Sequence, residues 1–233
     1  MTDEPFDFGT WRRGQVYYTA DLHLGHDRII KYCNRPFQTV EEMNQTIIKN
    51  INTTLTIYDT LVILGDLALG RLHDTLTLLG QIHATRIWVI PGNHDRFSLA
   101  YGHHGSPEVV MSKRRLWRHE YEQHSRRTIR CEPDREPSAW KIHVGGRPVL
   151  LSHYPYRGDS GDRDRYGWLR PAWGGLPLIH GHVHSKWQTR GPMFNVGVDV
   201  NGFYPVSEGE LVHWLMGIPV GGVGDVGGQV GLA

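Results

Sequence analysis

The chain contains short apolar runs that stop abruptly at a glycine, a histidine or an acidic residue. The clearest run spans residues 61–64 and is followed by Gly65 and Asp66. A short apolar run bounded by turn residues is typical of a fully buried strand. Four other strand-like runs end in the same way, at residues 15–20, 86–90, 149–152 and 176–179. We therefore expect five buried strands, each delivering polar side chains to the edge of a sheet.

Between the first three of these runs, the apolar residues recur at helical spacing. Thr39 and Glu42 fit a capping box, which predicts the start of a helix. The apolar face of this helix contains Val40, Met43, Ile47, Ile51 and Leu55. A second helix is predicted by Leu72, Leu76, Leu79 and Ile82. Strands and helices thus alternate from residue 15 to 90, which predicts a largely parallel sheet with its ligand outside the carboxyl ends of the strands.

Turn and cap residues predict the remaining elements. Gly145 and Gly146 are expected to turn a hairpin that spans residues 141–152. Residues 193–200 have the pattern of another strand, and Ser207 is placed to cap a terminal helix. The expected fold class is therefore α/β.

The domain organisation follows from length and composition. A chain of 233 residues is long enough for one large domain with a substantial core. We assign this domain to residues 15–216, with a lead-in at 1–14 and a flexible tail rich in glycine and valine at 217–233. Residues 101–140 differ, because apolar periodicity is lost and arginine is abundant. They predict a solvated helix or excursion, or alternatively a lid that handles an anionic substrate.

Charge and cysteine usage narrow the functional classes. The chain has 25 lysines and arginines against 24 acidic residues, so a general affinity for nucleic acid or an anionic membrane is not implied. No apolar run approaches the roughly 20 residues that would span a bilayer. Cys33 and Cys131 lie far apart, and the start of the chain lacks the pattern of a signal peptide. We expect a soluble cytoplasmic protein.

The polar residues at the five strand ends share one property, because all are of types that bind divalent metals. Carboxylate, amide and imidazole groups suit Mn, Fe, Zn or Mg. Two such ions need about seven or eight protein ligands together with water. The seven candidates are Asp21, His23, Asp66, Asn93, His153, His182 and His184. Taken singly, His153 could be a buried structural histidine and Asn93 a turn residue, but their recurrence at five strand ends favours a metal centre.

These residues give the chain a resemblance to the calcineurin-like metallophosphoesterases. The matching blocks are Asp21-x-His23, Gly65-Asp66, Gly92-Asn93-His94-Asp95, His153 and Gly181-His182-x-His184. Further matches resemble the small stand-alone members found in bacteria and their phages, and they lie at residues 25–26, 33–37, 152–155 and 195–199. The resemblance covers residues 15 to 215.

The resemblance implies both an architecture and a ligand assignment. Two mixed β-sheets would pack as a sandwich flanked by helices, with a dinuclear centre at the strand ends. One metal would be held by Asp21, His23 and His184, and the other by Asn93, His153 and His182. Asp66 would bridge the two ions.

The same resemblance implies catalytic roles. A hydroxide shared by the two metals would attack phosphorus in line. His94 would be the general acid that protonates the leaving oxygen, and Asp95 would orient its imidazole.

The leading hypothesis is a dinuclear phosphodiesterase that uses two divalent ions, with Mn favoured and Fe, Zn or Mg possible. Its substrate would be a small nucleotide or cyclic nucleotide. The alternatives are a nuclease that binds the nucleic-acid backbone through the arginines of residues 113–135, a phosphomonoesterase such as a protein phosphatase, and a non-catalytic scaffold. Candidate substrate contacts, which could equally be packing residues, are His26, Tyr154, Tyr156 and Arg157.

Overall fold

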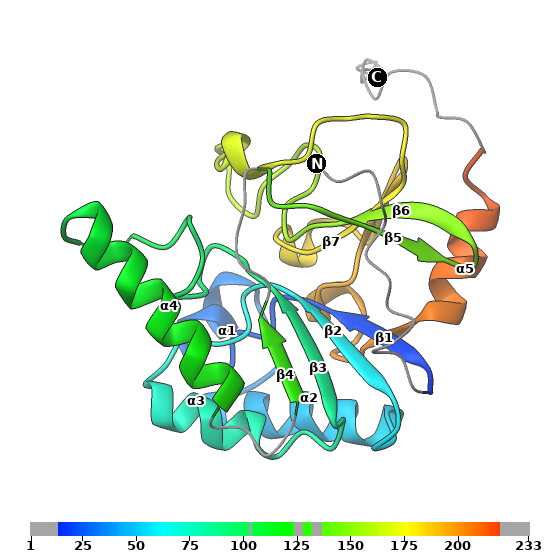
Figure 1. Ribbon diagram of the computed structural model, residues 1–233. Coiled ribbons are helices and arrows are strands. Elements are labelled where there is room, and N and C mark those ends of the chain that lie inside the picture. The colour runs from blue at the N-terminus through cyan, green and yellow to red at the C-terminus, as the bar shows by residue number, and fades with distance from the viewer. Residues whose placement is uncertain (1–13, 103, 124–127, 132–136, 220–233) are drawn as a thin grey trace.

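The computed structural model describes residues 14–102, 104–123, 128–131 and 137–219. Most of the predicted lead-in and tail therefore lie outside the described residues. The described chain is an α/β fold with two five-stranded sheets and flanking helices (Figure 1). The helices are α1 (Arg28–Tyr32), α2 (Val40–Thr54), α3 (Leu72–Leu79), α4 (Pro107–Gln123) and α5 (Glu208–Met216).

The first sheet is largely parallel, as the alternation of strands and helices predicts. Its strand order is β10-β1-β2-β3-β4, and only β10 runs antiparallel to its neighbour. The strands are β1 (Val16–Thr19), β2 (Thr60–Leu64), β3 (Arg86–Ile90), β4 (Thr128–Cys131) and β10 (Val206–Ser207). All residues of β2 are buried, which explains its uninterrupted apolar sequence.

The second sheet is mixed and has the order β5-β6-β7-β9-β8. Its strands are β5 (Trp140–Val144), β6 (Arg147–Leu151), β7 (Leu178–His180), β8 (Thr189–Arg190) and β9 (Met193–Asn195). The predicted hairpin joins β5 to β6. Gly145 and Gly146 have φ angles of 55° and 80°, which suits a two-residue turn that requires positive φ at both positions.

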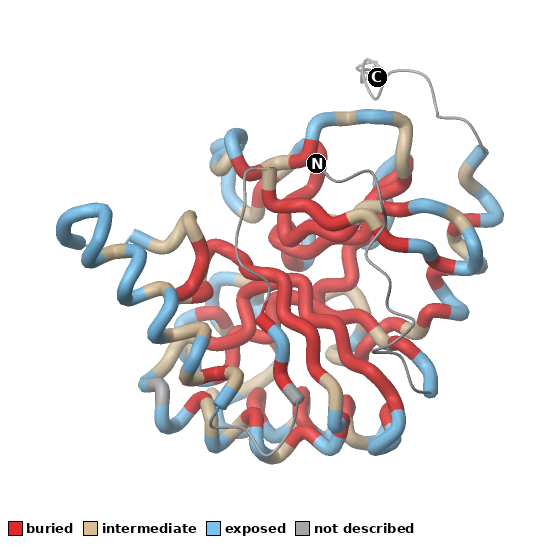
Figure 2. Tube along the Cα trace, in the orientation of Figure 1, coloured by how far each residue is buried: buried red, intermediate tan, exposed pale blue. Residues whose placement is uncertain are grey.

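Alternation along the strands produces two core layers. Val62, Leu64 and Trp88 face the second sheet, in a buried cluster that also contains Ile142 and Ile179. Figure 2 shows this buried layer between the sheets in red. The sheets therefore pack face to face as a sandwich.

The opposite face of the first sheet packs on helices. Leu61 and Ile63 contact a cluster that includes Met43 and Ile47 of α2 and Leu79 of α3. The predicted helix start is confirmed, because the Thr39 side chain accepts a hydrogen bond from the Glu42 amide at 3.1 Å. On the outer face of the second sheet, a smaller cluster covers β7 and β9, and its members are Tyr156, Leu178, Met193, Leu150, Trp173 and Trp187.

Residues 101–140 contain more structure than their sequence predicts. The expected solvated helix is α4, in which Tyr121 is buried and most of the other side chains are exposed or half-buried. The segment also supplies β4, which pairs parallel to β3 with Ile129 opposite Ile87. A short strand at a sheet edge need not be apolar throughout. Arg130 interrupts the apolar residues of β4, so a search for apolar runs does not find this strand. Several arginines of this segment lie outside the described residues.

Two further boundaries differ from expectation. The strand expected at residues 193–200 ends at Asn195, and the chain then forms the short 3-10 helix η4 (Val198–Val200). Two other 3-10 turns are η2 (Gly167–Leu169) and η3 (His184–Lys186). Across the described ranges, none of the helices has the length and apolar character needed to cross a membrane.

Candidate metal centre

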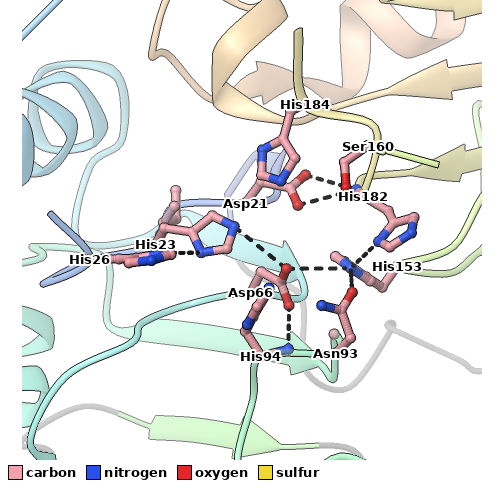
Figure 3. A network of polar contacts seen from close by, with 12 residues as sticks. Asp21, His23, His26, Asp66, Asn93, His94, His153, Ser160, His182 and His184 are labelled. Atoms are coloured by element: carbon pink, nitrogen blue, oxygen red, sulfur yellow. Dashed lines mark hydrogen bonds and ion pairs between the residues drawn. The ribbon is translucent and has the colours of Figure 1, made fainter. Parts of the chain in front are cut away.

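The candidate ligands gather where the carboxyl ends of the two sheets meet. Asp21 follows β1, and its carboxylate accepts a hydrogen bond from the backbone N–H of His182 at 2.9 Å. His153 follows β6, and its Nδ1 lies 2.8 Å from the carbonyl oxygen of Leu64 at the end of β2. Each contact joins one sheet to the other, and Figure 3 shows the one between Asp21 and His182. The centre is therefore also a junction of the sandwich.

Five of the seven candidate ligands have left-handed backbone conformations. Their φ angles are 57° for Asp21, 51° for His23, 54° for Asp66, 73° for His182 and 49° for His184. Positive φ is uncommon in residues other than glycine and costs of order 1 kcal/mol or more at each position. Such conformations bend the chain sharply after each strand, so that the side chains turn toward one point.

Two glycines permit the closest approach of backbone at this point. Gly65 has a φ of 80°, and a Cβ atom there would lie 2.5 Å from Nδ1 of His153. A Cβ atom at Gly92 would collide with the carboxylate and backbone of Asp66. The glycines before Asp66 and Asn93 are therefore steric requirements.

Asp66 lies at the middle of the cluster. Its Oδ2 is 3.5 Å from Nε2 of His23 and 3.6 Å from Nε2 of His153, and its side chain is 1% exposed. The other oxygen, Oδ1, accepts a hydrogen bond from the backbone N–H of His94 at 2.8 Å. Burial alone would raise the pKa of Asp66, but His153, His94 and His23 lower it below its ordinary range. This carboxylate remains charged and faces two separate imidazoles.

The hydrogen on His153 can be placed from its partners. A carbonyl oxygen only accepts, so Nδ1 must donate its hydrogen to Leu64. In the neutral ring, Nε2 then carries a lone pair. This lone pair lies 3.2 Å from Oδ1 of Asn93 and 3.2 Å from Nδ1 of His182. Because an amide oxygen can only accept, the contact with Asn93 brings two lone pairs together, and a shared cation would resolve that repulsion.

Burial favours the neutral form of two imidazoles, which is the form that binds a metal. Burial lowers the pKa of His23 well below its usual value and lowers that of His182 to about 4. Nε2 of His23 is buried and has no hydrogen-bond partner within the described parts of the chain. Such a nitrogen is costly to bury unless it binds something.

His184 and Asp21 form the remaining part of the cluster. With His23 they offer three ligand atoms that lie within 4.8 Å of one another. Burial would lower the pKa of His184, but the carboxylates of Asp21 and Asp199 raise it well above the usual value. Burial raises the pKa of Asp21. A divalent cation could bind between these three groups.

The spacing of the ligand atoms fits metal binding. Bonds of about 2.1 Å at angles near 90–110° place neighbouring ligand atoms roughly 3.0–3.4 Å apart. The distances from Nε2 of His153 to its three neighbours in the cluster are 3.2, 3.2 and 3.6 Å. All seven candidate ligands are buried and belong to one cluster, and their residue types are those of a divalent metal site.

His94 lies at the rim of the cluster. Its side chain is half-buried, and the centre of its ring is 5.2 Å from that of His23 and 6.2 Å from that of His26. Within the described residues, no hydrogen bond holds its ring nitrogens. The imidazole is therefore available to a bound molecule.

The expected role of Asp95 is wrong. Its carboxylate accepts backbone hydrogen bonds from Gly92 at 2.8 Å, Asp66 at 2.9 Å and Leu67 at 3.1 Å. Burial and the charge of Asp66 raise the pKa of Asp95 to about 7. Asp95 thus ties the turn after β3 to the turn after β2, and it does not orient the imidazole of His94.

The four candidate substrate contacts separate into different environments. His26 is half-buried, and its Nδ1 is 3.4 Å from Nδ1 of His23, so it lies at the rim. Tyr154 is buried against the rings of His153 and His182, where it supports ligands.

Of the other two candidates, only Tyr156 is excluded by its contacts. Tyr156 is wrong as a substrate contact, because it is buried and its hydroxyl donates to the carbonyl of Leu176 at 2.9 Å. Arg157 is exposed.

Three residues at the centre were not expected from the sequence. Oδ2 of Asp159 lies 3.3 Å from Nε2 of His182, and the same carboxylate pairs with Arg165 at 2.7 Å. Oδ2 of Asp199 lies 3.1 Å from Nδ1 of His184, and Arg35 binds both oxygens of this carboxylate. Arg35 and Asp199 lie inside the blocks that match the calcineurin-like metallophosphoesterases, and this position could have pointed to them. Asp159 gives no such signal, because it lies in a loop with the composition of an ordinary surface.

Comparison with known proteins gives relatives without a named activity. No family model matches the chain. The chain is 44% identical over 213 residues to uncharacterized protein MJ1445 of Methanocaldococcus jannaschii, a match that covers 86% of this chain and 91% of that protein. It is 33% identical over 172 residues to the gene 66 protein of Mycobacterium phage L5, covering 73% and 77% of the two chains.

A solved structure has a similar fold. The protein AQ665 from Aquifex aeolicus, described as a protein of unknown function, superposes with a TM-score of 0.58 at 22% identity. The match covers 86% of this chain and 98% of that chain. At this identity the likeness shows the fold alone.

The hydrogen bonds of Asp95 predict that its carboxylate stabilises the fold. An asparagine at this position offers one oxygen where the carboxylate offers two, so the Asp95→Asn variant leaves buried N–H groups unsatisfied. We expect its free energy of unfolding to fall by about 1–3 kcal/mol in urea denaturation. His94→Ala, which removes no buried hydrogen bond, serves as the matched control and is expected to remain within about 0.5 kcal/mol of the wild type. Unchanged stability of Asp95→Asn would contradict the structural role.

Proposed function

The chain belongs to the family of uncharacterized protein MJ1445 and the gene 66 protein of Mycobacterium phage L5, and we propose that it is a dinuclear metal-dependent phosphodiesterase. In this proposal its sandwich is of the metallophosphoesterase type. The resemblance of its five sequence blocks to the calcineurin-like metallophosphoesterases supports the proposal. The grouping of those blocks at one edge of two packed sheets supports it further.

The position of Asp66 carries the proposal. One buried carboxylate oxygen lies 3.5 Å from His23 and 3.6 Å from His153, and each imidazole belongs to a different group of candidate ligands. A single ion would need only one of these groups. A carboxylate placed between two groups is suited to bridge two ions.

The remaining ligands divide between the two positions. We assign one ion to Asp21, His23 and His184, and the other to Asn93, His153 and His182, with Asp66 shared. The mixture of imidazole nitrogen with carboxylate and amide oxygen favours Mn, Fe or Zn over Mg. When bound, two such ions would lower the pKa of water to generate a nucleophile and would neutralise charge on the phosphoryl oxygens.

The chain itself would position the substrate and handle the leaving group. His94 lies at the rim beside Asp66, and its backbone N–H holds the Asp66 carboxylate in place. Its free imidazole is suited to donate a proton to the departing oxygen. His26 lies on the same rim, and burial lowers its pKa, so its neutral ring could donate a hydrogen bond to a bound ester.

A small diester suits this site better than a polymer. The chain has a formal net charge of +1, which gives little long-range attraction for nucleic acid. Two cations of α4 are already engaged, because Lys113 donates to the carbonyl of His104 and Arg114 to that of Leu99. We therefore propose a small nucleotide or cyclic nucleotide diester as the substrate.

Metal dependence and the role of Asp66 can be tested together. We expect hydrolysis of bis(p-nitrophenyl) phosphate to be lost after treatment with a chelator and restored by Mn²⁺. The Asp66→Asn variant removes the bridging charge, so kcat/KM is expected to fall at least about 100-fold even with excess Mn²⁺. Asp162→Asn alters an exposed carboxylate and is the matched control.

Either of two results would count against this assignment. Full activity in the presence of the chelator would exclude metal dependence. Faster turnover of p-nitrophenyl phosphate than of the diester would replace the diesterase by a monoesterase.

The acid role of His94 predicts a dependence on the leaving group. An alkoxide leaves poorly unless it is protonated, whereas p-nitrophenolate leaves readily without a proton. We expect His94→Ala to lower kcat by about 100-fold or more for an alkyl leaving group, and by much less for p-nitrophenyl esters. An equal loss with both leaving groups would show that His94 has some other role.

A further inference from the structure

The ring of His184 is oriented by a carboxylate outside the group of ligands. Nδ1 of His184 lies 3.1 Å from Oδ2 of Asp199. Both oxygens of Asp199 already accept hydrogen bonds from Arg35, which pairs with it as a carboxylate, so Asp199 accepts from His184 and the hydrogen is on Nδ1. This arrangement reserves Nε2 for the centre that contains Asp21 and His23. The backbone of His184 is constrained as well, because its φ of 49° lies in the left-handed region.

Asp199 is in turn fixed by a buried arginine. Nε of Arg35 donates to Oδ1 of Asp199 at 2.8 Å, and one terminal nitrogen donates to Oδ2 at 2.9 Å. The two side chains are 0% and 2% exposed. A bidentate pair of this kind fixes the plane of the carboxylate as well as its charge.

The same guanidinium also holds the backbone of another ligand. Its remaining donors bind the carbonyl oxygen of Asp21 at 2.7 Å, that of Leu22 at 3.1 Å and Sδ of Met43 at 3.3 Å. All five N–H groups of Arg35 therefore have acceptors. Through these contacts one side chain fixes the strained turn at Asp21 and, by way of Asp199, the ring of His184.

The ligands of the second ion have different supports. His153 donates to the carbonyl of Leu64. Nε2 of His182 lies 3.3 Å from Oδ2 of Asp159, which is paired with Arg165. Arg35 and Asp199 make none of these contacts. Each ion position therefore has its own supporting carboxylate.

We propose that Arg35 and Asp199 are positioning residues for one ion of the pair, the ion assigned to Asp21, His23 and His184. The inference rests on the proposed function only in so far as the centre binds two divalent ions. It does not depend on which ester is hydrolysed, because its test measures metal affinity.

The effect of Asp199→Asn follows from charge as well as from hydrogen bonding. An asparagine oxygen can still accept from His184, but the negative charge that compensates Arg35 is lost. The guanidinium then remains buried beside an ion position without its counter-charge. Loss of such a supporting group typically lowers metal affinity by about 10- to 100-fold.

The experiment is a Mn²⁺ titration of protein freed of metal by a chelator, followed by the EPR signal of unbound Mn²⁺. We expect the wild type to bind two ions per chain. Asp199→Asn should weaken one ion by about 10- to 100-fold and leave the other unchanged. Asp159→Asn is the matched variant for the second position, and Asp59→Asn alters a hydrogen-bonded carboxylate away from the centre.

A background with one ion position identifies the ion. His153→Ala removes a ligand of the second position, so one ion remains. In this background, Asp199→Asn should weaken the remaining ion, whereas Asp159→Asn should not. If Asp199→Asn does not fold, the double variant Arg35→Met with Asp199→Asn removes both buried charges and is titrated in its place.

The possible outcomes are distinct. Equal weakening of both ions would show general loosening, and unchanged affinity would show that the pair does not position His184; either result overturns the inference. A wild type that binds two ions but hydrolyses no ester would refute the phosphodiesterase while leaving this test valid. A wild type that binds fewer than two ions would overturn both proposals.

Discussion

The structure depends on the burial of one charged carboxylate at the junction of two sheets. Asp66 is 1% exposed and lies between imidazoles from both sheets. A buried charge is costly unless it is paired and hydrogen-bonded. The backbone N–H of His94 and the neighbouring imidazoles of His153 and His23 compensate this charge. The strained turns and the glycines beside them are the geometric consequence of bringing these groups together.

The four imidazoles of the centre share one arrangement. Each turns one ring nitrogen toward a partner outside the cluster and keeps the other nitrogen for the cluster. The outer partners are the carbonyl of Leu64 for His153, Asp159 for His182, Asp199 for His184 and His26 for His23. A carbonyl or carboxylate partner fixes both the tautomer and the orientation of a ring, whereas the His26 ring helps to orient His23. The same arrangement on four rings supports the proposed metal centre.

Much of the fold could be predicted, because the apolar positions within each segment determine whether it forms a buried strand or a helix. The strand predicted at residues 86–90 has those bounds as β3, and the helix that Thr39 caps begins at Val40. In both segments the apolar positions decide burial without reference to distant residues. The strand β4 could not be found in this way, because it forms only by pairing with β3 at an edge that tolerates charge.

The supporting residues were harder to predict than the ligands. Ligands follow buried strands, and this position makes them visible in a sequence. Asp199 and Arg35 act across 164 positions of sequence, and Asp159 lies in a loop whose composition resembles a solvated surface. The sequence predicts that Asp95 orients the imidazole of His94, whereas its carboxylate accepts hydrogen bonds from backbone amides of two turns. Contacts to backbone leave no trace in residue type.

The most direct test of the central claim is anomalous diffraction from crystals grown with Mn²⁺. We predict two anomalous peaks about 3.5–4 Å apart, with Asp66 in contact with both. One peak should lie beside His23 and His184, and the other beside His153 and His182. A single peak, or ions bound away from Asp66, would contradict the dinuclear centre on which the proposed chemistry rests.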